Sequence, residues 1–155
     1  ALAKTGHFLT VCQHAFICYS PNQINTLSRA KYSIASLAQL LDACSQDIGF
    51  GYDIGCTNLI TVFQSSIGNK AAASGLRFFV GAFHGYAHNH WCQIHFHPQV
   101  LTIAGLKDFE TCEWVFSQEN CCAHLFRHGS AFHHHMTLDW FYQTWDLDHH
   151  AALGE

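Results

Sequence analysis

The sequence is poor in charge. Asp, Glu, Lys and Arg make up 12 % of its 155 residues, about half of the roughly 25 % that is usual. Three residues are arginine, and the net charge at pH 7 is −4. A protein that holds nucleic acid by electrostatics alone needs a basic face. The composition excludes such a binder, and we expect DNA binding by this chain alone to be weak or absent.

Long apolar runs, proline and Cys-x-x-Cys pairs are also scarce or missing. No apolar stretch reaches the roughly 18 residues of a membrane-spanning helix, so we expect no membrane partner. Residues 1–6 are too short and polar for a secretory signal. This favours an intracellular protein with eight reduced cysteines, the alternative being a secreted disulfide protein. Two prolines and no repeat or linker predict one domain over residues 1–155.

Apolar residues are plentiful, at 49 % of the chain, which excludes disorder for most of it. Their periodicity alternates along the chain between the patterns of strands and of amphipathic helices. Such alternation is typical of an α/β layered domain. The expected strands are residues 7–19, 48–56 and 76–83; the expected helices are 27–44, 57–66, 106–123 and 130–145, with a loop over 67–75.

Histidine and cysteine are densest in residues 84–97. His84, His88 and Cys92 are each four residues apart and would share one face if this stretch were helical. Imidazole and thiolate are the ligands that zinc prefers, and a tetrahedral site needs four. The alternative is a set of buried histidines that bond to backbone carbonyls. The open choices for the fourth ligand are His95, His97, Cys56 and the Cys12/His14 pair.

Asp53 ends a short apolar run that reads as a buried strand. The carboxyl ends of such strands are where α/β sheets bind ligands. A carboxylate there is a candidate magnesium ligand. The alternative is a capping role at the turn into the next helix.

Two further acids lie in the helix expected over residues 106–123. On a helical wheel centred on Phe109, Glu113 falls inside the arc formed by the apolar residues, and Glu110 falls at its edge. A carboxylate on a buried stripe is costly unless something pairs with it. Glu113 is therefore the better site candidate from the wheel, the alternative being a glutamate whose stem lies along the apolar face.

Several short motifs, which we call sequence words, resemble those of a known family when they are taken in order. They are Phe-Leu-Thr-Val-Cys12-Gln-His14-Ala-Phe, Ala30-Lys-Tyr32, Gly-Tyr-Asp53-Ile-Gly-Cys56, Val80-Gly-Ala-Phe-His84-Gly-Tyr-Ala-His88-Asn, Trp91-Cys92-Gln, Gly105-Leu-Lys-Asp108-Phe-Glu110-Thr-Cys112-Glu113, Phe116-Ser117 and Ser130-Ala-Phe-His133. The ordered set resembles the Kyakuja-Dileera-Zisupton (KDZ) transposases of fungal genomes. The resemblance covers nearly the whole chain.

The resemblance implies a ribonuclease-H-like fold, a mixed sheet flanked by helices, in a nuclear enzyme that cuts and joins DNA. It implies two-metal catalysis with Mg²⁺ held by acidic residues. Asp53 would be the second catalytic acid, and Glu113 or Glu110 the late acid. His84, His88 and Cys92 match the His/Cys word of the family, which implies a zinc-stabilised insert.

Two departures bear on activity. Family members usually carry a first catalytic Asp upstream of the Cys-x-His word, and no acid precedes Cys12 here. We therefore expect a fragment that lacks its first strand or strands and is inactive alone. The family words also usually carry arginine at four positions that here hold Gln13, His90, Trp114 and His134.

Each of these four residues is one C-to-T or G-to-A transition from an arginine codon. We hypothesise a decayed transposon copy whose CpG-containing arginine codons have mutated. An ordinary CpG content in the coding DNA would contradict this hypothesis. The alternatives to a transposase or nuclease domain are thus a His/Cys zinc-binding module and a relic without function.

Overall fold

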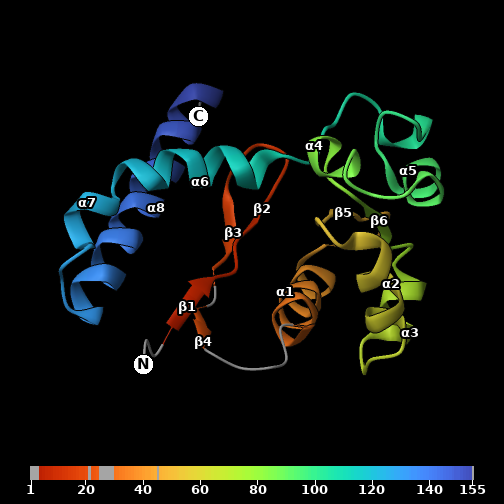
Figure 1. The fold of residues 1–155 in the computed structure, drawn as a ribbon, viewed down its shortest axis with the longest axis horizontal. Coiled ribbons are helices and arrows are strands. Elements are labelled where there is room, and N and C mark those ends of the chain that lie inside the picture. Colours follow the sequence, from red (N-terminus) through yellow and green to blue (C-terminus); the bar gives the residue numbers. More distant parts are fainter. Residues whose placement is uncertain (1–3, 21, 25–29, 45, 155) are drawn as a thin grey trace. The chain divides into compact units, whose positions relative to one another are not determined.

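The computed structural model describes residues 4–20, 22–24, 30–44 and 46–154. Their fold is mixed α/β, with helices and small two-stranded sheets (Figure 1). The chain divides into two compact units. The first comprises Ala1–Phe8 and Pro21–Glu110, and the second comprises Leu9–Ser20 and Thr111–Glu155. Within the described ranges, no helix is long and apolar enough to cross a membrane.

The first unit is built around a parallel strand pair, β5 (Gly49–Gly51) and β6 (Arg77–Phe79). Parallel strands need a crossover connection, which here contains α2 (Gly55–Phe63) and α3 (Gly68–Ala73). These elements pack with α1 (Ala30–Ala43). The buried core of this unit contains Leu37, Leu41, Phe50, Val62, Ala71, Leu76, Phe78, Val80, Cys92 and Phe96.

Other elements of the first unit precede α1 or follow β6. β1 (Lys4–His7) pairs antiparallel with β4 (Asn22–Ile24). After β6 the chain forms α4 (Ala82–Gly85), α5 (His90–Phe96) and the 3₁₀ turn η1 (Thr102–Ala104). The His/Cys-rich segment of the sequence therefore lies on short helices directly after the parallel pair.

The second unit contains an antiparallel strand pair and three helices. β2 (Thr10–Val11) pairs with β3 (Ile17–Tyr19). The helices are α6 (Thr111–Cys121), α7 (Ala123–Phe126) and α8 (Ala131–Leu153). α8 is capped at both ends, because the Ser130 hydroxyl accepts the backbone N–H of His133 and Gly154 takes the left-handed conformation that suits glycine.

Two long-range hydrogen bonds attach α8 to the β2–β3 turn within the second unit. Asp146 Oδ1 accepts the backbone N–H of Ile17 at 3.0 Å. Trp145 Nε1–H donates to the carbonyl of Ala15 at 2.8 Å. Polar groups at the turn are thereby satisfied by the helix rather than by water.

Part of the element prediction is confirmed. The helices expected over 27–44 and 57–66 appear as α1 and α2, although residues 27–29 lie outside the described part. The strands expected over 48–56 and 76–83 appear as the shorter β5 and β6, and the helix expected over 130–145 extends to Leu153. The prediction of a mixed α/β fold is correct.

The strand expected over 7–19 is wrong. The chain turns in the middle of that stretch, where the backbone N–H of Cys12 donates to the Phe16 carbonyl at 3.0 Å. Ala15 has a φ of 69°, which is unusual for a residue other than glycine. The loop expected over 67–75 is also wrong, because its alanine-rich Gly68–Ala73 segment forms α3.

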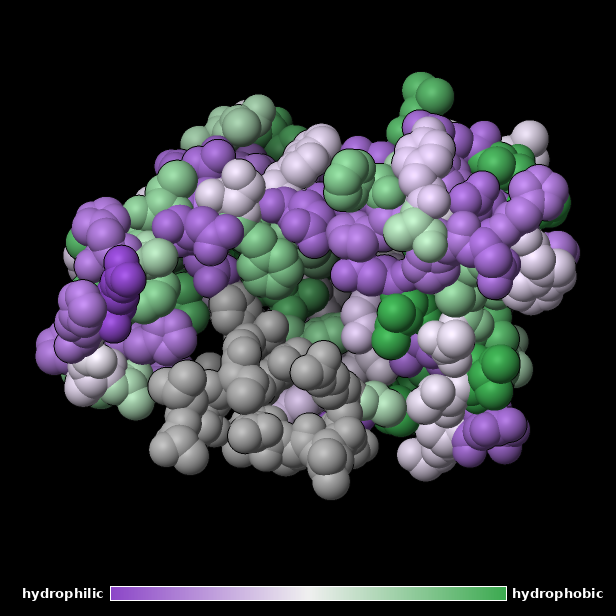
Figure 2. Space-filling view, viewed as in Figure 1, coloured by the Kyte–Doolittle hydropathy of each residue, from purple (hydrophilic) through white to green (hydrophobic). Residues whose placement is uncertain are grey.

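The helix expected over 106–123 begins only at Thr111. Phe109 has a φ of 60°, so the backbone before Glu110 is not helical. Leu106, an apolar residue at the start of the expected helix, is fully exposed. Figure 2 shows other apolar side chains at the surface among polar ones. The wheel therefore does not apply to residues 106–110.

Candidate metal centres

The first unit brings two acids and a histidine together. His84 Nδ1 lies 3.5 Å from Asp53 Oδ1 and 3.5 Å from Glu110 Oε2. The side chain of Glu110 is 11 % exposed, that of His84 is 32 % exposed and that of Asp53 is 56 % exposed. We call these three residues the acid–histidine group. Its graded exposure leaves one side of the group open to solvent.

Asp53 is placed by the turn between β5 and α2. The backbone N–H of Tyr52 donates to the Phe79 carbonyl at 3.0 Å, which extends the link between the parallel strands by one residue. Gly55 then begins α2 so close to β6 that a Cβ there would lie 2.5 Å from the Phe79 oxygen. Asp53 thus stands at the carboxyl end of β5, where α/β folds hold ligands.

Glu110 is fixed by the chain around it. Its Oε1 accepts the backbone N–H of Phe83 at 2.7 Å, and its own N–H donates to Asp108 Oδ1 at 3.1 Å. A Cβ on Gly81 would lie 2.5 Å from the same Oε1. Glycine at this position lets the carboxylate approach the start of α4, the helix that carries His84.

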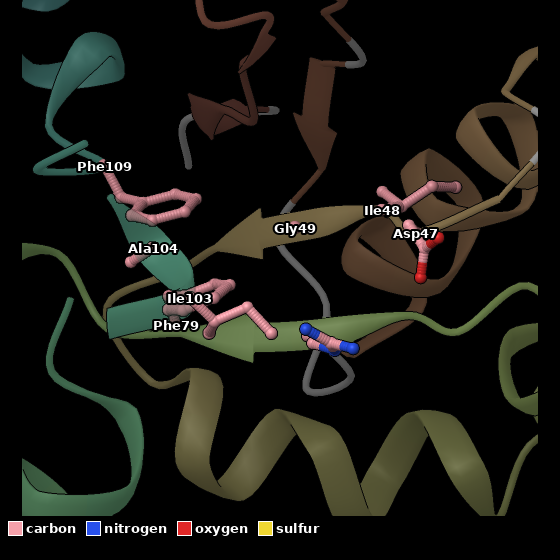
Figure 3. A pocket seen from close by; sticks show the side chains of 8 residues that line it. Asp47, Ile48, Gly49, Phe79, Ile103, Ala104 and Phe109 are labelled. Atoms are coloured by element: carbon pink, nitrogen blue, oxygen red, sulfur yellow. The ribbon is translucent and has the colours of Figure 1, made fainter. Parts of the chain in front are cut away.

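The left-handed backbone at Phe109 aims Glu110 toward this site. The Phe109 ring stacks on Phe79 with centroids 4.5 Å apart and an interplanar angle of 12°. It also covers β5, because a Cβ on Gly51 would lie 2.6 Å from the Phe109 Cβ. The same rings line a pocket of about 420 Å³ that also includes Ile103 (Figure 3). Aromatic packing therefore fixes the residue just before Glu110.

Each acid of the acid–histidine group lies at a distance from His84 that a shared divalent cation would allow. His84 Nδ1 is buried and makes no hydrogen bond of ordinary geometry within the described part of the chain. Neighbouring ligands bonded at about 2.1 Å to one ion lie about 3.0–3.4 Å apart, close to the two measured separations. Two carboxylate oxygens and one imidazole nitrogen also suit Mg²⁺, Mn²⁺ or a transition metal.

A second group joins three other ligands in the same unit. Cys56 lies on α2, His88 lies between α4 and α5, and Cys92 lies on α5. His88 Nδ1 is 3.5 Å from Cys56 Sγ and 3.2 Å from Cys92 Sγ, and the three ligand atoms lie within 4.8 Å of one another. We call these three residues the Cys/His group.

The environment of Cys92 favours the neutral thiol when no cation is bound. The side chain is buried, at 3 % exposure. Burial, and then the hydrogen bond and charge of Cys56, raise the pKa of Cys92 to about 11. A bound cation would reverse this preference, because metals bind the thiolate.

The helix expected to hold His84, His88 and Cys92 on one face does not form. α4 ends at Gly85, and α5 begins only after Asn89, whose side chain accepts the backbone N–H of Cys92 at 2.9 Å. Because the helix breaks here, His84 joins the acids and His88 joins the cysteines. The Cys56 alternative from the sequence is the one found beside His88 and Cys92.

The other histidine alternatives have local partners. His97 is buried, with Nε2 3.0 Å from the Ala82 carbonyl and Nδ1 3.2 Å from the backbone N–H of Gln99. Both ring nitrogens are thus used, as expected of a core histidine. His95 Nδ1 lies 2.8 Å from the Trp91 carbonyl, and its ring stacks on that indole.

Three sequence candidates lie in the second unit. Cys12 and His14 occupy the β2–β3 turn, where the backbone N–H of His14 lies 3.4 Å from Cys12 Sγ. Glu113 is exposed on the first turn of α6. The buried positions of α6 are Val115 and Glu119 instead, so the expectation that Glu113 lies on a buried stripe is wrong.

Sequence reasoning did not foresee that His84 would lie beside two acids. The available signal was the glycine before α4, since Gly81 permits the close approach of Glu110. The chain is thus a mixed α/β protein in which an acid after the first strand of a parallel pair, a second acid and a histidine form a candidate metal site.

A comparison with models of known protein families identifies the family of this chain. The model described as KDZ: Kyakuja-Dileera-Zisupton transposase matches residues 1–146. The chain belongs to this transposase family, as the sequence words indicated. No curated protein and no solved structure gives a significant match. Family membership implies a role in transposition and DNA as the partner.

Proposed function

We propose that the chain forms the metal-binding core of a ribonuclease-H-like DNA transposase that acts in the nucleus. Asp53 and Glu110 are its metal-binding acids, and His84 is a third ligand. The observation that carries the proposal is the convergence of these two distant acids on one buried imidazole nitrogen, each at 3.5 Å. We assign the part of the late acid to Glu110, and Glu113 stays the alternative.

The topology around Asp53 supports this assignment. β5 and β6 are parallel and joined through α2 and α3, and the acid follows β5 directly. Ligands in open α/β sheets bind outside the carboxyl ends of such strands. An acid at the end of such a strand matches the position that the family resemblance implies for the second catalytic acid.

Each residue of the acid–histidine group has a different role in the proposed site. A divalent ion bound there would polarise the phosphodiester and lower the pKa of a bound water. Glu110, held by the Phe83 N–H, is the rigid ligand. Asp53, with the most exposed side chain of the three, faces the side from which a DNA backbone can approach. His84, on α4, supplies the third ligand.

The group provides ligands for one ion. Two-metal cleavage needs a second ion about 4 Å away and further carboxylates to hold it. We therefore expect this chain to bind one divalent ion and to leave DNA uncut when tested alone. Cleavage and strand transfer would then require another acid brought to the site.

Mn²⁺ binding tests the assignment, with calorimetry or electron paramagnetic resonance as the readout. We expect D53N, E110Q and H84Q each to weaken Mn²⁺ binding at least about tenfold, because each removes a direct ligand. The exposed D139N variant on α8 is the control and should bind as the unaltered chain does.

The comparison of E110Q with E113Q decides between the two late acids. Loss of Mn²⁺ binding in E113Q with full binding in E110Q would contradict the assignment of Glu110. Undiminished binding in D53N would overturn the proposed site altogether.

A further inference from the structure

The Cys/His group is separate from the acid–histidine group and has no part in the proposed phosphodiester chemistry. Its members come from two stretches far apart in the sequence, Cys56 on α2 and His88 with Cys92 around the start of α5. Cys92 is 3 % exposed, whereas the other two are partly buried. Three soft ligands therefore converge at the edge of a buried core.

The ligand chemistry selects the ion. Thiolate and imidazole bind zinc far better than magnesium, whereas carboxylate oxygen suits magnesium and manganese. Zinc is usually tetrahedral, so two sulfurs and one nitrogen leave one position for water or another ligand. The first unit thus contains soft sulfur and imidazole ligands in the Cys/His group and hard carboxylate ligands in the acid–histidine group.

The surroundings of the Cys/His group hold its ligands in place. Asn89 caps α5 by accepting the backbone N–H of Cys92 at 2.9 Å. The Gln93 side chain donates to the His88 carbonyl at 2.8 Å. Supporting hydrogen bonds of this kind orient metal ligands and tune affinity.

The two groups share their supporting backbone. Cys56 follows Asp53 by three residues in the same turn into α2, and His88 follows His84 by four. A cross-link between Cys56 and His88 would therefore restrain the chain segments that carry Asp53 and His84. The Cys/His group lies where a cross-link would fix the acid–histidine group.

We propose that Cys56, His88 and Cys92 bind one Zn²⁺ ion, and that this ion holds Asp53 and His84 at the spacing needed for the second metal. Cys56, His88 and Cys92 are then positioning residues. The zinc part stands independently, and the positioning part rests on the function proposed for the acid–histidine group.

Metal analysis of the purified full chain tests the zinc part. We expect about one equivalent of zinc, reduced at least fivefold in C56S, H88N and C92S. The matched controls C44S and C121S alter exposed cysteines elsewhere and should keep their zinc, as should H84Q. Zinc-free chain, or equal loss in C44S, would overturn the proposal.

A measurement on the unaltered chain covers the case in which the variants do not fold. X-ray absorption at the zinc edge should show two sulfurs at about 2.3 Å and nitrogen or oxygen at about 2.0–2.1 Å. A shell of oxygen and nitrogen without sulfur would contradict the assignment. A Cys56–Cys92 disulfide in place of bound zinc would also contradict it.

The positioning part is tested by measuring the Mn²⁺ affinity before and after a zinc-selective chelator removes zinc. We expect Mn²⁺ to bind about tenfold more weakly to the zinc-free chain and to recover when zinc is restored. Unchanged Mn²⁺ affinity would overturn the positioning role and leave the zinc site standing. Absence of Mn²⁺ binding in both forms would overturn the proposed function instead.

Discussion

At the residue scale, the second unit contains a buried acid with a phenol donor. Glu119 is 8 % exposed, and its Oε2 accepts the Tyr142 hydroxyl at 2.8 Å. A buried carboxylate is stable only when donors surround it. The pair links α6 to α8, so a local hydrogen bond contributes to the packing of two helices.

Replacement of Tyr142 by Phe should destabilise the second unit by about 1–3 kcal/mol, because it removes one donor from a buried carboxylate. Urea unfolding followed by circular dichroism measures the change. Tyr86→Phe is the control, since Tyr86 is 70 % exposed and its hydroxyl lies 3.4 Å from Gln99 Oε1. Equal stability of both variants would show that the Glu119 bond contributes nothing.

The same phenol gives a pH dependence. Burial, and then the charge of Glu119, raise the pKa of Tyr142 above its usual value of about 10. The unfolded chain therefore loses this proton first as the pH rises. The contribution to stability is complete below about pH 10 and is lost as the pH climbs toward the folded pKa.

Unfolding free energies measured from pH 8 to pH 11 should decline more steeply above pH 10 in the unaltered chain than in Tyr142→Phe. The two proteins differ only in this hydroxyl, so the difference between the two slopes isolates it. Identical slopes would contradict the prediction.

The residue types in the sequence identified candidate ligands, but they did not show which of these ligands lie together. Asp53, His84, His88, Cys56 and Cys92 were candidates from residue type and spacing, and Glu110 was the second choice after Glu113. Their partners depend on packing, because Glu110 reaches His84 only through the left-handed Phe109 and the small Gly81. The glycine permits the approach of Glu110 but does not identify which side chain approaches it.

At the element scale, the break between α4 and α5 separates the two candidate metal centres. The chain leaves the helical conformation before Asn89, whose side chain starts α5. An unbroken helix would have put His84, His88 and Cys92 on one face. Helical periodicity alone cannot reveal such a break, since capping competes with helix continuation.

Asn89→Ala should destabilise the first unit by about 1 kcal/mol, as expected for loss of an N-cap. It should also weaken zinc binding severalfold, because Cys92 lies in the first turn of α5. Urea unfolding and competition with a zinc-binding dye give the two readouts. Asn89→Asp keeps a capping oxygen and should retain most of both properties; failure of Asp to rescue them would argue against the cap.

The elements predicted correctly are those with strong periodicity or a compact apolar run, such as α1, α2, β5 and β6. The missed turn between β2 and β3 has a left-handed residue, Ala15, that is not glycine. The carbonyl of Ala15 accepts a hydrogen bond from the Trp145 side chain on α8. A turn stabilised by a distant helix leaves no local sequence signal.

At the scale of the whole molecule, the acidic balance conflicts with a family whose partner is DNA. The four positions where family members usually carry arginine hold uncharged or weakly basic side chains. Three of them, Gln13, His90 and Trp114, are exposed, and His134 is partly buried. Arginines at these positions would therefore reach solvent, which is consistent with lost phosphate contacts.

Restoring arginine at all four positions should raise the net charge by four and strengthen binding to duplex DNA at least about tenfold at low salt. The dependence of log K on log salt should become steeper by about 0.9 for each phosphate contact regained. Fluorescence anisotropy with a labelled duplex, repeated across salt concentrations, measures both.

The matched control carries four arginines at other exposed positions, Q39R, Q64R, N69R and N120R. Its binding should improve less than that of the restored chain. Equal improvement would mean that added charge alone suffices and that the four family positions have no special role.

The sequence by itself determined the family, the mixed α/β class and the list of candidate metal-binding side chains, because ordered words, periodicity and residue chemistry are local properties. Only the tertiary structure decided how those side chains are grouped. It placed His84 with Asp53 and Glu110, and it placed His88 with Cys56 and Cys92. The physical reason is that the helix break at Asn89 gives His84 and His88 different neighbours, and that the stacking of Phe109 on Phe79 joins segments far apart in the chain.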